Sequence, residues 1–170
     1  DKSVTDAKAA LNDAINSATA TATDVKNAQQ ALDDAVTAAK SAQEGAAATA
    51  NKAVTDVPAS VKDSDAVKDA IAKVQGLTKD LTADAATKSA IDQAKQELAA
   101  AVAEQQGVRS DAVTAAKSAL DATAPVSGEV ADQIAALQKK LGDSSATASD
   151  IKQAMNDLND AVATAKQERQ

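Results

Sequence analysis

The side chains of this chain that could do chemistry are acids, lysines and hydroxyls. The best carboxylate candidates are the pair Asp33-Asp34 and the triplet Asp63-Ser64-Asp65. A calcium loop needs several oxygen ligands at alternating positions and a distant bidentate Glu, and neither stretch supplies that set. A solvated helix face explains the pair, and a helix N-cap explains the triplet. We therefore expect no metal site and no cofactor.

The chain also lacks the usual partners of a catalytic nucleophile. Ser and Thr are abundant, but a hydroxyl nucleophile needs a base, which without His would have to be a Lys or an amine. Lys8, Lys95 and Lys152 sit on regular helix faces beside Asp, Glu and Gln, where solubility explains them. The chain has no His, Cys, Trp, Tyr or Phe and only 5 Gly, which also argues against a phosphate loop. We expect no catalytic residues and no enzymatic activity.

Charge and hydropathy exclude further classes. The net charge of −7 over 170 residues argues against nucleic acid and against an anionic membrane surface as partners. No run approaches the ~20 apolar residues of a membrane span, so membrane insertion is not expected. The helical pattern begins almost at once after Asp1, without a signal peptide, and we expect the chain to be a segment of a longer protein.

The elements that carry these side chains repeat. Four stretches share a branched aliphatic residue, Ala at +3, Leu at +7, Ala at +10 and a second branched aliphatic at +11. Such spacing places all five side chains on one stripe of an α-helix, and its recurrence is typical of a repeat architecture. The four copies are Val4-Ala7-Leu11-Ala14-Ile15, Val25-Ala28-Leu32-Ala35-Val36, Ile91-Ala94-Leu98-Ala101-Val102 and Ile151-Ala154-Leu158-Ala161-Val162.

Six helices are predicted, over residues 3–18, 23–55, 63–80, 84–122, 127–141 and 147–168. Thr21 with Asp24, and Thr147 with Asp150, have the spacing of a capping box with Asp in place of Glu. Pro58 and Pro125 should each end a long helix. Gly142 begins a predicted C-cap and turn.

Inside the two long helices, Gly45 and Gly107 mark the expected kinks or breaks. The octapeptide AVTAAKSA occurs at 35–42 and again at 112–119. The distance in sequence between the two copies of the octapeptide exceeds the distance between the second and third motif copies by about three helical turns. This difference suggests an insertion that keeps the apolar stripe in phase.

These patterns predict an all-α protein, built as elongated tandem three-helix bundles with long connecting helices. The bundles are expected at 1–82 and 83–170. With 46 Ala residues the chain gains helix propensity and close helix packing, but buries little apolar area per residue.

The stretches TATDVKNAQQALDDAV (21–36) and TASDIKQAMNDLNDAV (147–162) resemble the FIVAR-type helical repeats of Gram-positive cell-wall proteins. That family forms tandem three-helix bundles in adhesins, extracellular-matrix-binding proteins and secreted carbohydrate-active enzymes, and it has no catalytic residues to carry over. Its repeats usually hold a tyrosine before the second helix, which this chain lacks. The resemblance implies an extracellular, cell-wall-associated stalk or adhesion module, monomeric, whose partners are neighbouring repeats of the same longer protein.

The function expected from these observations is that of a non-enzymatic stalk or spacer in a bacterial surface adhesin, working through length and stiffness. One alternative is a three-helix binding module for a host or matrix protein. Such a surface normally carries aromatic, Met or Arg anchors, and this chain offers only Met155, Arg109 and Arg169. A further alternative is a desiccation-protective helical protein, since residues 35–53 resemble the repeats of late-embryogenesis-abundant proteins. Circular dichroism in plain buffer separates that alternative from the stalk.

Overall fold

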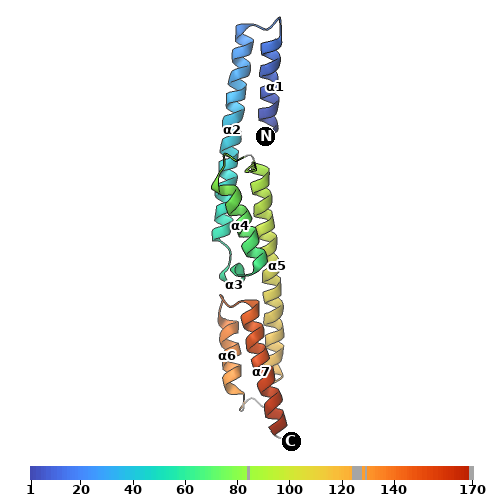
Figure 1. Ribbon diagram of the computed structural model, residues 1–170. Coiled ribbons are helices and arrows are strands. Elements are labelled where there is room, and N and C mark those ends of the chain that lie inside the picture. Colours follow the sequence, from blue (N-terminus) through green and yellow to red (C-terminus); the bar gives the residue numbers. More distant parts are fainter. Residues whose placement is uncertain (84, 124–127, 129, 169–170) are drawn as a thin grey trace. The chain divides into compact units, whose positions relative to one another are not determined.

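The protein is all-α. A computed structural model describes residues 1–83, 85–123, 128 and 130–168, and in these residues it contains seven helices and no strand. The helices are α1 (Lys2–Asn16), α2 (Ala22–Thr55), α3 (Ala59–Lys62), α4 (Asp65–Lys79), α5 (Lys88–Asp121), α6 (Ala131–Gly142) and α7 (Ala148–Glu168). Figure 1 shows the two long helices, α2 and α5, and the shorter helices along them.

The six predicted helices are present with small shifts at their ends, and α3 is an additional short helix. Pro58 lies just after the end of α2 and acts as the N-cap residue of α3. Proline is suited to this place because it cannot donate the hydrogen bond that would continue α2. Pro125 lies outside the described residues. Gly142 is the last residue of α6, and the following Asp143 is the C-cap.

Both predicted capping boxes are confirmed. The carboxylate of Asp24 accepts from the backbone N–H of Thr21 at 2.8 Å and from its hydroxyl at 2.7 Å, and the Thr21 hydroxyl accepts from the N–H of Asp24 at 3.2 Å. Thr147 and Asp150 make the same three bonds at 3.0, 2.9 and 3.1 Å. The bond from the threonine N–H, followed by the bond from its hydroxyl, holds the pKa of Asp24 and of Asp150 below the ordinary 3.8.

These boxes predict an acid-sensitive contribution to stability. A carboxyl whose folded pKa is lowered stabilises the fold above the unfolded value near 3.8, and this contribution is lost as the pH falls through the lower folded pKa. The double variant Asp24→Ala, Asp150→Ala should therefore lose less of its stability than the parent chain between pH 5 and pH 2. Urea midpoints followed by circular dichroism measure this, with Asp69→Ala on an exposed face as the matched control. An equal loss of stability between pH 5 and pH 2 in the parent chain and in the double variant would contradict this prediction.

The expected breaks at Gly45 and Gly107 are wrong. Both glycines lie inside uninterrupted α-helices, and a Cβ built on either would meet no atom within 4 Å. A single glycine costs a helix only about 1 kcal/mol relative to alanine, which the flanking hydrogen-bonded turns easily outweigh.

The two long helices also have equal lengths of 34 residues. An insertion that lengthens α5 relative to α2 is therefore not present.

The chain forms two compact units that each combine two stretches of sequence. Unit 1 contains Asp1–Val54 and Lys73–Gln96, and unit 2 contains Thr55–Ala72 and Glu97–Gln170. The boundaries fall within or at the ends of α2, α4 and α5, because single helices continue from one unit into the other. The expected division into bundles at 1–82 and 83–170 stays a prediction.

The core of unit 2 is built from three helical segments. Ala112 and Ala116 of α5 share it with residues of α6, α7 and the loop between them. Small side chains on α5 let that helix approach the larger residues opposite, whose burial supplies most of the apolar area. The larger buried members are Val130, Leu137, Ile151 and Leu158.

The four motif copies are buried to different extents. Ile91 and Leu98 of the third copy, and Ile151 and Leu158 of the fourth, are at most 1 % exposed. In the first two copies Val4, Leu11, Val25 and Leu32 are only half-buried, and Ile15 is 61 % exposed. One sequence pattern thus occupies two different environments in the same protein.

Candidate functional site

The acidic residues singled out in the sequence lie apart on the surface. Asp33 and Asp34 are exposed on α2, where the Gln30 side chain donates to Asp34 at 2.9 Å. Asp63 is the C-cap residue of α3, and the Ser64 hydroxyl accepts from the N–H of Val67 at 3.4 Å at the start of α4. The described residues contain no group of three or more acids that could hold a metal ion.

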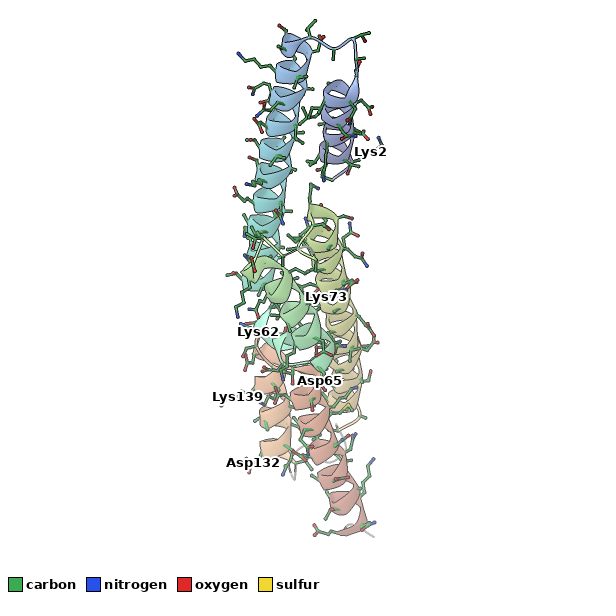
Figure 2. All side chains as sticks on the ribbon, turned by 45° about the horizontal axis from the view of Figure 1, so that its top comes forward. Lys2, Lys62, Asp65, Lys73, Asp132 and Lys139 are labelled. Carbon is green, nitrogen blue, oxygen red and sulfur yellow. The ribbon has the colours of Figure 1, made fainter. Side chains whose placement is uncertain are left out.

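The lysines named in the sequence are surface residues as well. Lys8 and Lys152 are exposed, and Lys95 is half-buried with its ammonium 3.9 Å from Asp92. Figure 2 shows Asp132 and Lys139 of α6 with side chains directed away from that helix. Lys2 lies at the start of α1, where its ammonium is 2.6 Å from Asp6 of the same helix. Among the helices as described, none has the length and apolar character needed to cross a bilayer.

Two of the three residues considered as anchors for a host protein lie in the described part of the chain, and both have structural contacts there. Met155 is half-buried against the core of unit 2. Arg109 reaches across from α5 to the loop between α6 and α7, where its Nε donates to the Ala146 carbonyl at 2.8 Å and its Nη2 donates to the Asp143 carbonyl at 3.1 Å. Arg169 lies outside the described residues.

Unit 1 contains the same arrangement with a different side chain. Gln43 of α2 donates through Nε2 to the carbonyls of Leu81, at 2.8 Å, and Ala86, in the loop between α4 and α5. We call these two arrangements, Gln43 with its loop and Arg109 with its loop, the loop clamps. In each clamp a long polar side chain on a long helix satisfies carbonyls of the loop that joins the next two helices. Sequence reasoning missed the clamps, because their partners are distant in sequence.

The acceptor loops have a common internal geometry. Asp80 accepts from the hydroxyl of Thr82 at 2.6 Å and from its N–H at 2.9 Å, and Asp143 accepts from Ser145 at 2.6 and 2.8 Å in the same way. The hydroxyl and then the N–H of Thr82 lower the pKa of Asp80, and those of Ser145 lower the pKa of Asp143. Each loop is therefore held by hydrogen bonds of its own in addition to those of its clamp.

Removal of a clamp should loosen its loop. Arg109→Ala leaves the carbonyls of Ala146 and Asp143 without their donors and should cost about 1 kcal/mol of stability. Arg109→Gln should recover part of this loss, since glutamine does the same work at position 43. Urea denaturation measures the cost, and amide exchange should show faster exchange confined to the 143–147 loop. Equal stability of the alanine and glutamine variants would mean that the donated bonds are not the cause.

Unit 1 has an open groove lined by the start of α1, the middle of α2, the α4–α5 loop and the first turns of α5. Its volume is about 1050 Å³. We call it the unit 1 groove. Its lining residues are Asp1, Lys2, Ala39, Gln43, Ala83, Ala86, Thr87, Lys88, Ser89, Asp92, Gln93 and Gln96.

The chemistry of this groove differs from that of an active site. Of its lining residues only Ala86 is buried, and the charged ones pair locally, with Lys2 on Asp6 at 2.6 Å and Lys88 on Asp92 at 2.5 Å. The Lys88 ammonium, as the largest influence, lowers the pKa of Asp92. Exposed pairs at this spacing contribute little energy. The groove offers alanine surface and amide groups, which suit the packing of a helix.

Comparisons with known proteins add no relative. The sequence matches no family model, and neither the curated proteins nor the solved structures contain a significant match. The resemblance to FIVAR-type repeats stays a prediction that depends on the helix pattern quoted above.

Proposed function

We propose that this chain is a non-enzymatic helical repeat segment that acts as a stalk or spacer in a bacterial surface adhesin. The observation that carries the proposal is the sharing of long helices. The first part of α2 belongs to the hairpin with α1, and its later part holds the α4–α5 loop through Gln43. A helix shared in this way leaves no flexible linker between successive groups of helices.

Helix length supports the same function. At ~1.5 Å per residue, each 34-residue helix is about 50 Å long. The repeated loop clamps at Gln43 and Arg109 add side-chain bonds to the packing of the short helices against the long ones. A spacer needs this kind of local, repeated attachment, because each group of helices then adds length without depending on distant contacts.

The spacer function predicts an extended molecule in solution. A compact chain of 170 residues would have a radius of gyration of roughly 15–16 Å. A spacer of stacked helical groups should exceed this value by about half again or more. Small-angle scattering on a verified monomer measures it. A value near the compact figure would remove the physical basis of the spacer mechanism.

The cellular part of the proposal needs a separate test. In a parent surface protein, replacement of this segment by a Gly/Ser linker with the same number of residues should shorten the mean reach of the terminal domain, since a flexible chain spans less than a helix-reinforced one of that length. Adhesion that depends on reach should fall, while the isolated terminal domain should bind its target unchanged. Unchanged adhesion would contradict the spacer mechanism.

A further inference from the structure

We infer that the α1–α2 hairpin is an acceptor site for one further helix of the same type as residues 40–63, supplied by a neighbouring repeat. This inference rests on the proposed function, since it names the partner that a repeat segment meets at this site. The acceptor surface consists of α1, residues 22–39 of α2 and the unit 1 groove.

The first argument comes from corresponding positions in three helix pairs. The pairs α1–α2, α4–α5 and α6–α7 each begin with a short helix, in or directly before which two apolar residues lie seven positions apart. These residues are Val4 and Leu11 of α1, Val67 and Val74 of α4, and Val130, the N-cap residue of α6, with Leu137. The residues of the second and third pairs are at most 1 % exposed, and those of the first pair are half-buried. The same difference separates Leu32 from Leu98 and Leu158.

The second argument is that the later pairs each have a third helical segment with which they interact. The α6–α7 pair packs against Ala112 and Ala116 of α5 and is clamped by Arg109. In unit 1, Gln43 holds the α4–α5 loop, and Thr78 of α4 donates to the Asn51 side chain of α2 at 2.9 Å. In the α1–α2 loop, Ala20 occupies the position that corresponds to Ala86 and Ala146 in the other two loops. Ala20 is only half-buried, whereas Ala86 and Ala146 are buried.

The third argument concerns the unit 1 groove. Unit 2 has a smaller cavity of about 250 Å³ at the corresponding place, between the start of α4, Gln105 of α5 and residues 147–149 at the start of α7. Ser60 and Val61 of α3 line that cavity and are themselves buried. In the unit 1 groove, the positions that correspond to Ser64, Gln105 and residues 147–149 are Asp1, Ala39 and residues 87–89. The lining of this groove includes no counterpart of α3. We attribute the larger volume of the unit 1 groove to the absence of a counterpart of the segment Val57–Asp63 from its lining.

These arguments specify the chemistry of the partner. It is an Ala-rich helix with a long amide or guanidinium donor, like Gln43, placed to reach the α1–α2 loop. One and two turns later it carries small residues like Ala46 and Ala50, and it ends in a Val-Pro-Ala-Ser-Val turn that enters the groove. Asp1 caps α1 through a 2.9 Å bond from the N–H of Ser3, as Ser64 caps α4. The partner helix can therefore join α1 as α3 joins α4.

The test is a variant of the full chain in which a copy of residues 40–63 is joined directly before Asp1. The matched control carries Ala46→Gln and Ala50→Gln within the added copy, which preserves helix propensity but blocks close approach. Amide exchange at residues 4–15 and 25–36 should be at least about tenfold slower in the variant than in the control. Equal exchange rates in the two would overturn the inference.

A trans experiment on the unmodified chain tests the same site without a covalent link. A capped peptide of residues 40–63 should bind saturably, and the Ala46→Gln, Ala50→Gln peptide should bind at least about tenfold more weakly. Ile15→Asp in the chain should also weaken binding, and it should leave the chain folded because Ile15 is already exposed. Equal binding of both peptides, or no slowing of exchange in the joined variant, would count against the acceptor site.

Sedimentation of the unmodified chain separates this partner from a second copy of the whole chain. A concentration-dependent dimer that Ile15→Asp abolishes would assign the surface to self-association and overturn the inference. The inference and the proposed function can fail independently. An extended chain whose amide exchange is not slowed by the added segment would exclude only the acceptor site. A compact chain whose amide exchange is slowed by the added segment would exclude only the spacer function.

Discussion

Replacing Leu158 by alanine should cost about 2–4 kcal/mol of unfolding free energy, among the largest effects expected of a single truncation in the described part of the chain. Leu158 is fully buried, and it lies in the core that α5, α6 and α7 share. Its truncation removes buried apolar atoms and leaves a cavity in this core, and both effects lower the free energy of unfolding. Chemical denaturation followed by circular dichroism measures the loss.

The matched comparison is Leu32→Ala, at the same position of another motif copy. Leu32 is half-buried, so less apolar area returns to water and no closed cavity remains. We expect it to cost about 1 kcal/mol, and an exposed change such as Lys152→Ala about 0.5 kcal/mol or less. Equal costs for Leu158→Ala and Leu32→Ala would mean that the two copies share one environment in solution. Leu32 would then already be covered by another molecule.

The second large effect is expected from filling a position where alanine is required. Ala116 is fully buried in α5 and packs into the unit 2 core, so that Ala116→Leu must displace α6 or α7. Overpacking of this kind should cost about 1–3 kcal/mol. The neighbouring Ala115 is exposed on the same helix, and Ala115→Leu should change stability by no more than about 0.5 kcal/mol. Urea midpoints of the two variants compare a buried and an exposed alanine at nearly equal helix propensity.

If Ala115→Leu and Ala116→Leu proved equally harmless, the close approach of α5 to its neighbours would be refuted. The result also bears on the abundance of alanine. The 46 alanines contribute helix propensity throughout, but only a few, such as Ala50, Ala94 and Ala116, are fully buried. At those positions small size is what brings two helices together.

The candidate site shows where the sequence pattern was informative. The capping residues Thr21, Asp24, Thr147 and Asp150 were recognised because each cap is formed within four consecutive residues. The loop clamps were not recognised, because a single Gln43 or Arg109 on a helix has no local sign of its distant acceptor. Arg109 was considered only as an anchor for an external protein, yet it binds the loop of its own chain.

The sequence by itself determined the all-α class, the approximate ends of the six longer helices and the capping boxes that begin α2 and α7. These features depend on helix propensity, on proline and on hydrogen bonds between near neighbours, all of which are encoded within a few residues. The kinks expected at Gly45 and Gly107 failed because the hydrogen bonds of many turns outweigh one unfavourable residue.

Only the tertiary structure decided which of the equivalent stripes is covered. The stripe that contains Leu11 and the stripe that contains Leu158 obey one pattern, and no local signal separates them. Burial depends on whether another helix lies against the stripe, and that neighbour comes from a distant part of the chain. The unit 1 groove also depends on a neighbour that is distant in sequence. In unit 2 the space beside Ser64 is lined by α3, and in unit 1 the lining beside the equivalent Asp1 has no such helix.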